Sequence, residues 1–244
     1  MAENRRSARP PPAMIRALVT AGPTHEPIDA VRFIGNRSSG RMALAIADAL
    51  AGQGCRVTVL SGPGVHAGPP AAAAADRVRQ FTTADDLGRL LAEEWPSHDL
   101  LVMAAAVADF KPARRAEGKL RRHASIAPID LVPTGDLLAG LADSTRPDQF
   151  VVGFALEDPA ELDRSARDKL ARKRADVIVA NPLATMDSAD VDATLYLRDG
   201  RAERPADRPM PKPAFAAWLA ARILPEVRAR LERGGTATLP DPHP

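Results

Sequence analysis

The sequence has little of several residue types, and each scarcity excludes a class of protein. Cys55 is the only cysteine in 244 residues, which excludes intrachain disulfides and thiolate zinc clusters. It lies beside an apolar run, so we expect a buried small hydrophobe rather than a catalytic thiol. Aromatic residues make up only 4%, which leaves few side chains for stacking nucleic-acid bases. The formal net charge is only +2, from 33 basic and 31 acidic residues, so no nucleic-acid partner is expected.

Long apolar runs are missing as well, because no segment reaches the roughly 18–20 apolar residues that cross a bilayer. Met1–Pro12 is basic and proline-rich and lacks the apolar centre of a secretory signal. We therefore expect no membrane association and a cytoplasmic location. Residues 1–15 and 233–244 are expected to be disordered tails. Residues 16–232 are then expected to form one domain.

What is present is an alternation of strand-like apolar runs with segments of helical period. Such alternation favours an α/β fold, a doubly wound and mainly parallel sheet with ligands beyond the carboxyl ends of its strands. Residues 65–76 and 111–145 interrupt the rhythm; we expect a surface loop in the first and a lid or binding loop in the second. The strands are expected at 17–20, 56–60, 100–107, 150–156, 176–180 and 194–197, and the helices at 41–53, 84–95, 159–174 and 213–231.

Two stretches near the expected strand ends could bind phosphate or carboxylate. Ser38, Ser39 and Gly40 precede a predicted helix, where hydroxyls and free backbone N–H groups face outward together. An ordinary helix N-cap explains the same residues, and the G-x-G-x-x-G fingerprint is absent. Further along, small residues at 104–108 would let a flat ligand approach the backbone beside Asp109. That carboxylate could bind a base, a sugar or a metal, or could cap the following turn.

Basic residues gather at two places. Residues 117–122 put three cations on the expected lid, where they could neutralise a triphosphate, although a basic surface turn is the simpler explanation. Lys169 and Lys173 are four apart on a predicted helix, so they share one face suited to phosphates or simply to solvent. Together these signals describe a nucleoside triphosphate site without a Walker A lysine, kinase motifs or clustered histidines.

At this level of detail the sequence resembles the phosphopantothenate–cysteine ligase family, the synthetase half of a bacterial bifunctional coenzyme A enzyme. The resemblance covers roughly residues 16–224. The motifs that carry it are Val19-Thr-Ala-Gly-Pro-Thr-His-Glu-Pro-Ile-Asp, Asn36-Arg-Ser-Ser-Gly, Ala104-Ala-Ala-Val-Ala-Asp-Phe, Val152-Gly-Phe-Ala and Ala180-Asn. The flavin-dependent decarboxylase half has no counterpart here, so we expect a stand-alone ligase without flavin, with a separate decarboxylase as one possible partner.

The resemblance implies a Rossmann-like fold with a small dimerisation subdomain, a mobile basic flap and a homodimer. It also implies a two-step reaction. The carboxylate of 4′-phosphopantothenate attacks the α-phosphate of a nucleoside triphosphate, CTP more often than ATP, and cysteine then displaces the nucleotide. Mg²⁺ is expected on the substrate phosphates rather than on a protein cluster.

The resemblance also implies residue roles. Asn36 resembles the asparagine that holds the acyl-nucleotide, and Lys119 the first lysine of the flap. The implied nucleotide site comprises Met103, Ala104, Ala105, Asp109, Lys119, Gly135, Asp136, Leu137, Leu138, Phe154, Lys169 and Lys173.

The chain departs from the family pattern in three places. The flap reads Lys119-Leu-Arg-Arg, which exchanges ammonium groups for guanidinium groups that are not equivalent to them. Pro133-Thr-Gly precedes Asp136 in place of asparagine–proline. The stretch that begins at Asn181 also differs, and we expect it in the dimer interface.

Two other functions remain open from the sequence. An NAD(P)-binding oxidoreductase is disfavoured because Ser61, not an acidic residue, ends the second strand. A non-catalytic nucleotide-binding regulatory subunit is disfavoured because Asn36 and Lys119 are both kept.

Overall fold

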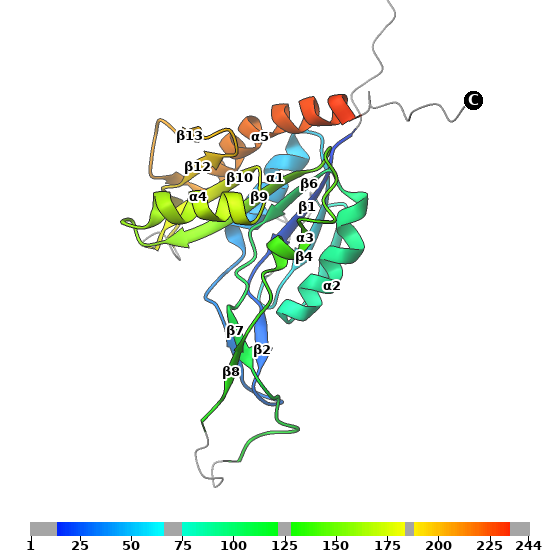
Figure 1. The fold of residues 1–244 in the computed structure, drawn as a ribbon, viewed down its shortest axis with the longest axis vertical. Coiled ribbons are helices and arrows are strands. Elements are labelled where there is room, and N and C mark those ends of the chain that lie inside the picture. Colours follow the sequence, from blue (N-terminus) through cyan, green and yellow to red (C-terminus); the bar gives the residue numbers. More distant parts are fainter. Residues whose placement is uncertain (1–13, 66–74, 122–127, 184–187, 235–244) are drawn as a thin grey trace, which may run out of the picture.

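The computed structural model describes residues 14–65, 75–121, 128–183 and 188–234 (Figure 1). Most of the two expected tails lies outside these residues, as does most of the expected loop at 65–76. Ile15, in the expected N-terminal tail, is buried, and the last helix continues to Gly234. No helix among the described residues is long and apolar enough to span a membrane.

An eight-stranded sheet in the order β13-β12-β10-β9-β6-β1-β4-β5 forms the centre of the molecule. The six strands from β10 to β5 are parallel, whereas β12 and β13 are antiparallel. This confirms the predicted α/β fold with a mainly parallel sheet. The strands are β1 (Arg16–Ala21), β4 (Arg56–Ser61), β5 (Arg77–Gln80), β6 (Leu100–Met103), β9 (Phe150–Glu157), β10 (Val177–Pro182), β12 (Thr194–Leu197) and β13 (Ala202–Glu203).

Helices cover both faces of the sheet, as Figure 1 shows. Alternation along β1 divides the core: Val19 packs in the cluster beneath α1 and α5, and Leu18 packs in the cluster beneath α2, α3 and α4. Because both faces are buried, the strands read as continuous apolar runs. The helices are α1 (Arg41–Gly52), α2 (Ala84–Glu94), α3 (Leu137–Leu141), α4 (Leu162–Arg172) and α5 (Lys212–Gly234), with a 3₁₀ turn at Trp95–Ser97.

Most predicted elements are present, with shifted ends. Helix α2 begins at Ala84, as predicted, and Thr83 and Asp86 form a reciprocal capping box before it. Helix α4 begins at Leu162 rather than at Pro159, because the residues before it form a turn. The prediction of a strand through residues 100–107 is wrong, since β6 ends at Met103.

An arm projects from the carboxyl-end side of the sheet (Figure 1). It consists of two antiparallel pairs: β2 (His25–Pro27) with β3 (Phe33–Gly35), and β7 (Phe110–Pro112) with β8 (Leu131–Pro133). None of these short strands was predicted; β8 lies within the expected irregular connection at 111–145, and β7 overlaps its start. A further small pair joins β11 (Asp190–Val191) to β14 (Met210–Pro211).

Candidate active site

A cavity of ≈ 850 Å³ opens beyond the carboxyl ends of β6, β9 and β10, at the first turn of α1. This is where a doubly wound sheet places its ligands. Almost all of the predicted site residues line it, from five separate parts of the chain. They are Asn36, Ser38, Ser39, Gly40, Met103, Ala104, Ala105, Asp109, Gly135, Asp136, Leu137, Leu138, Phe154, Lys169 and Lys173.

The exception is Lys119, which is absent from the cavity lining. It belongs to the arm, where Gly118 and Leu120 on either side of it are bonded to the turn after β2. Lys119 was expected among the nucleotide-binding residues, but within a single chain it does not lie beside them.

The first turn of α1 is open toward the cavity. The N-cap is Gly40, with φ +70°, and among the described residues no side chain caps this helix and no acidic residue lies in its first turn. A Cβ at Gly40 would lie 2.8 Å from the Val65 side chain, so this position needs glycine. The alternative explanation, an ordinary helix N-cap formed by the serine hydroxyls, is therefore wrong. Ser38 Oγ accepts from Gly40 N at 3.4 Å, and Ser39 Oγ accepts from the Arg41 guanidinium at 3.1 Å. The first-turn N–H groups are therefore available to an anion.

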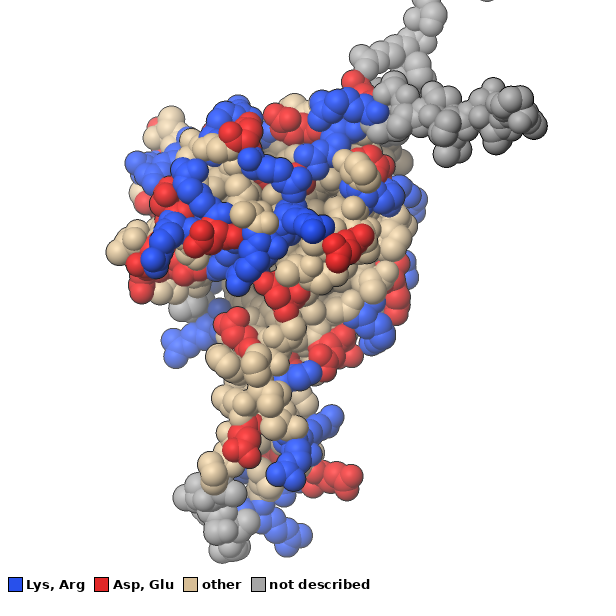
Figure 2. All heavy atoms as spheres, viewed as in Figure 1, with Lys and Arg blue, Asp and Glu red and all other residues tan. Residues whose placement is uncertain are grey.

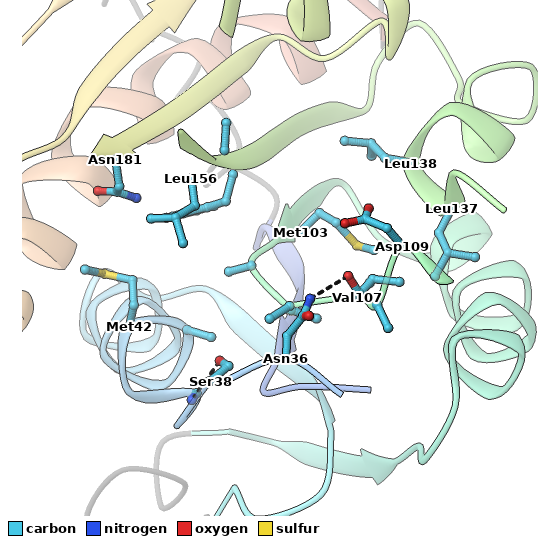
Figure 3. A pocket seen from close by; sticks show the side chains of 18 of the residues that line it. Asn36, Ser38, Met42, Met103, Val107, Asp109, Leu137, Leu138, Leu156 and Asn181 are labelled. Atoms are coloured by element: carbon cyan, nitrogen blue, oxygen red, sulfur yellow. Dashed lines mark hydrogen bonds between the residues drawn. The ribbon is translucent and has the colours of Figure 1, made fainter. Parts of the chain in front are cut away.

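Asn36 lies at the middle of the cavity, between this helix and the end of β6 (Figure 3). Its Nδ2 donates to Val107 O at 2.9 Å, which fixes the amide plane and leaves Oδ1 and the second N–H free to bind substrate.

Two threonines of β1 and the following turn explain why the chain leaves the sheet at Met103. Ala105 N donates to Thr20 Oγ1 and Ala108 N donates to Thr24 Oγ1, each at 3.0 Å. These hydroxyls replace the partners that a continuing strand would have needed. The small residues 104–108 are therefore held as a shaped wall of the cavity.

Asp109 and Asp136 lie at the end of the cavity formed by α3 and α4. Figure 3 shows Asp109 near Leu137 and Leu138. The Asp136 carboxylate caps α3 by accepting from Ala139 N at 3.1 Å, and it lies 3.3 Å from Lys173 Nζ. Burial alone would raise the pKa of Asp136, but the Ala139 N–H and the Lys173 ammonium outweigh it and lower that pKa.

Lys169 lies in the last turn of α4, Lys173 is the C-cap residue of that helix, and both line the cavity. Each is already paired, since Lys169 bonds the Glu157 carboxylate and Lys173 bonds Asp136. Burial opposes ionisation of Glu157, yet bonds from Lys169 and Ser165 lower its pKa. The two lysines therefore present partly neutralised, well-positioned ammonium groups.

A second wall of the cavity was not predicted from the sequence. Asn181 lines it, and its buried Oδ1 has no hydrogen-bond partner among the described residues; the dimer interface expected for its stretch stays a prediction. Figure 3 shows Asn181 near Met42, across the cavity from Leu137. The stretch at 184–187 lies outside the described residues. Leu156, Leu183, Val191 and Lys212 complete this wall. In the sequence, only the Ala180-Asn motif pointed to this wall, because its other residues are far apart in the chain and come together only in the folded protein.

Metal-binding chemistry is limited at this site. The described residues contain no group of three or more His, Cys, Asp or Glu side chains that could hold a metal ion. The carboxylates of Asp109 and Asp136 could contribute one or two ligands to a cation that already binds phosphates.

Cys55 is buried, as expected, and His25 packs against a neighbouring ring. That ring is Phe33, and the two ring centroids are 3.6 Å apart. Burial lowers the pKa of His25 and raises that of the Cys55 thiol.

Comparison with known proteins gives a consistent result. Residues 13–226 match the model of the "DNA/pantothenate metabolism flavoprotein C-terminal domain". The bifunctional coenzyme A biosynthesis protein CoaBC of Mycolicibacterium smegmatis is 41% identical over 189 residues, which is 74% of this chain and 45% of that protein. A protein named cysteine/cysteine sulfinic acid decarboxylase, from an unknown prokaryotic organism, is 42% identical over 168 residues, which is 69% of this chain and 46% of it.

Among solved structures, the C-terminal domain of a CoaBC protein superposes with a TM-score of 0.71 at 32% identity, covering 90% of this chain and 96% of that one. The chain spans about half the length of the curated relatives that it matches.

Proposed function

The chain belongs to the DNA/pantothenate metabolism flavoprotein C-terminal domain family, and from that premise we propose that it joins 4′-phosphopantothenate to L-cysteine through an acyl-nucleotide intermediate. The observation that carries this proposal is the single cavity in which Asn36, the uncapped start of α1 and the α3–α4 residues meet. These groups suit a substrate with several negative charges and a flat base.

In the first step of the proposed reaction, a carboxylate oxygen of phosphopantothenate forms a bond to the α-phosphorus and pyrophosphate leaves. The first-turn N–H groups of α1 and the Lys169 and Lys173 ammonium groups would balance the charge on the phosphates. The backbone at Met103–Ala105 would approach the base, and Asp109 would accept hydrogen bonds from the base or sugar. The role of the chain is to hold two anions close together, which lowers the entropic cost of their reaction.

In the second step, the cysteine amine attacks the acyl carbon, the nucleoside monophosphate leaves and the amine loses a proton. A carboxylate is a poor electrophile, whereas the acyl phosphate has a good leaving group. Asn36 is well placed to hold the intermediate, because its bond to Val107 O fixes the orientation of the amide. We propose Mg²⁺ on the substrate phosphates, where it would screen their charge, and CTP rather than ATP as the nucleotide.

Lys119 enters this scheme only if the flap moves or if a second copy of the chain supplies it. We propose a homodimer formed through the arm. The exposed apolar side chains of the arm are Val31, Phe33, Phe110, Leu120, Ile129, Leu131 and Val132. Figure 2 shows a mostly uncharged near face of the arm around β7 and β8, below a body with interspersed charges. Apolar exposure of this extent is typical of a protein–protein interface.

The proposal is tested by measuring pyrophosphate release with phosphopantothenate, Mg²⁺ and CTP or ATP in turn, with and without cysteine. Amide formation that requires cysteine, together with nucleoside monophosphate release, would support the ligase and name its nucleotide. If folded protein binds nucleotide but releases no pyrophosphate under any condition, a non-catalytic subunit replaces the ligase. Saturable binding of NADPH in place of nucleotide would favour the oxidoreductase.

The product of this reaction carries a new cysteine carboxylate. Removing that carboxylate is a decarboxylation, a reaction of a different class from the ligation proposed for this chain. We propose a separate decarboxylase as a functional partner. Assaying carbon dioxide release with and without added decarboxylase tests this extension.

A further inference from the structure

A buried carboxylate in the arm contacts the segment that carries Lys119. Asp29 lies in the turn between β2 and β3 and is 2% exposed. Its Oδ1 accepts from Val31 N and Arg32 N, each at 2.7 Å, which closes its own turn. Its Oδ2 accepts from the Arg32 guanidinium at 3.1 Å and also from Leu120 N at 3.1 Å. The last bond joins residues 91 positions apart in the chain.

Backbone hydrogen bonds also join the flap segment, residues 116–120, to the residues on either side of Asp29. Ala30 N donates to Gly118 O at 3.1 Å, and Ala116 N donates to Ile28 O at 2.9 Å. The Arg32 guanidinium contacts Leu120 O at 3.4 Å. Lys119 therefore sits between two residues whose backbone is bonded to the turn, while its own side chain is exposed.

A turn-closing role alone does not explain this arrangement. Oδ1 suffices to close the turn, so Oδ2 is left to hold Arg32 and Leu120. A carboxylate that accepts backbone N–H bonds is a strong acceptor, because such bonds are charge-assisted. Bonds from Val31 and Arg32 N–H groups also lower the pKa of Asp29, so it stays ionised at neutral pH.

We propose that Asp29 is a positioning residue for Lys119, and that its carboxylate fixes the flap backbone at Leu120 and so sets where the Lys119 ammonium is presented. The effect on turnover rests on the ligase function proposed above. The effect on the flap backbone does not, because it follows from the Leu120 contact alone.

The test uses Asp29→Asn, which keeps the volume of the side chain and removes one of its two acceptor oxygens and its charge. The matched control is Asp85→Asn, the same chemical change at a carboxylate that pairs with Lys111 of β7 at 2.7 Å. Hydrogen exchange at the Leu120 amide is the readout that needs no activity. We expect Asp29→Asn to speed that exchange roughly ten-fold or more, and Asp85→Asn to leave it within about two-fold of the wild type.

Turnover provides the second readout. Asp29→Asn should lower kcat roughly 10- to 100-fold while the nucleotide dissociation constant stays within about two-fold, since a misplaced catalytic group affects the chemical step most. In the double variant Asp29→Asn/Lys119→Gln, kcat should be no lower than in Lys119→Gln alone, because Asp29 acts through Lys119.

Unchanged Leu120 exchange in Asp29→Asn overturns the proposal, and so do fully additive losses of kcat in the double variant. If Asp29→Asn does not fold, Leu120→Pro replaces it, because it removes the N–H donor on the flap side and leaves the Asp29 turn intact. Equal kcat in Leu120→Pro and wild type would then overturn the proposal. Wild-type protein without ligase activity would refute the proposed function instead, and the exchange result would still decide the role of Asp29.

Discussion

Asn36→Asp is the substitution that tests the proposed mechanism most directly. The change replaces the Nδ2 donor, which now bonds Val107 O at 2.9 Å, with a second oxygen that repels that carbonyl. It also places a negative charge in the cavity where the mechanism requires bound phosphates. The side chain would lose both its fixed orientation and its ability to donate to the intermediate.

The expected magnitude follows from the hydrogen bond that is lost. A hydrogen bond to a charged group contributes about 1.5–3 kcal/mol, and each 1.36 kcal/mol corresponds to roughly ten-fold in rate. We therefore expect kcat to fall between about 10-fold and about 150-fold. Asn36 is exposed, so the free energy of unfolding should change by less than about 0.5 kcal/mol. Loss of function without loss of stability separates a role in the site from a structural role.

The assay is rapid quenching with quantification of acyl-nucleotide, pyrophosphate and nucleoside monophosphate in one time course. Urea unfolding measures stability on the same preparation. Gln53→Glu is the matched control, because it makes the same amide-to-carboxylate change at the far end of α1. A kcat for Asn36→Asp within about two-fold of the wild type would refute the role of Asn36 and the placement of the reaction centre.

Three further predictions concern the cavity and the arm. Gly40→Ala should lower the free energy of unfolding, measured in urea, by about 1–3 kcal/mol, because it combines a positive φ with a Cβ contact at 2.8 Å. Gly54→Ala should lower it by less, because only the positive φ acts there and nothing lies within 4 Å of the added Cβ, and equal losses in the two variants would contradict the packing argument. Leu131→Asp should convert the dimer to a monomer in sedimentation experiments, whereas the control Val78→Asp, which changes an exposed apolar residue on β5, should leave the dimer intact. A monomeric wild type would refute the arm interface. The pKa of Asp136 is lowered in the folded state, so its contribution to stability is complete above the unfolded pKa of 3.8 and is lost as pH falls through the folded pKa. Asp136→Asn should therefore weaken the fall in the free energy of unfolding at acid pH, measured by urea titration, and parallel pH profiles of that free energy in variant and wild type would exclude the contribution.

Sequence patterns identified the main strands of the sheet, and almost every predicted site residue lines the cavity, although the wall around Asn181 was not predicted. Apolar runs, the Thr83 cap and the strand–helix alternation are local properties, so each main element could be located from its own residues. The resemblance assigned the residues around Asn36, Asp109 and Asp136, and the fold brings all three to one cavity.

The elements that were predicted wrongly or not at all have two physical causes. The strand expected to reach residue 107 ends at Met103 because Thr20 and Thr24, far away in sequence, supply the competing hydrogen bonds. The strands of the arm are only three residues long, too short for a periodic signal.

Taken alone, the sequence determined the fold class, the order of the elements and the chemical character of the site, because local propensity and side-chain chemistry are written residue by residue. The tertiary structure decided which of those residues meet. It placed Asn181 and Lys212 on the cavity wall, paired Lys169 and Lys173 with carboxylates, and left Lys119 on the arm beside Asp29. Such contacts join residues far apart in the chain, and they arise only when packing of the sheet and its helices fixes their relative positions.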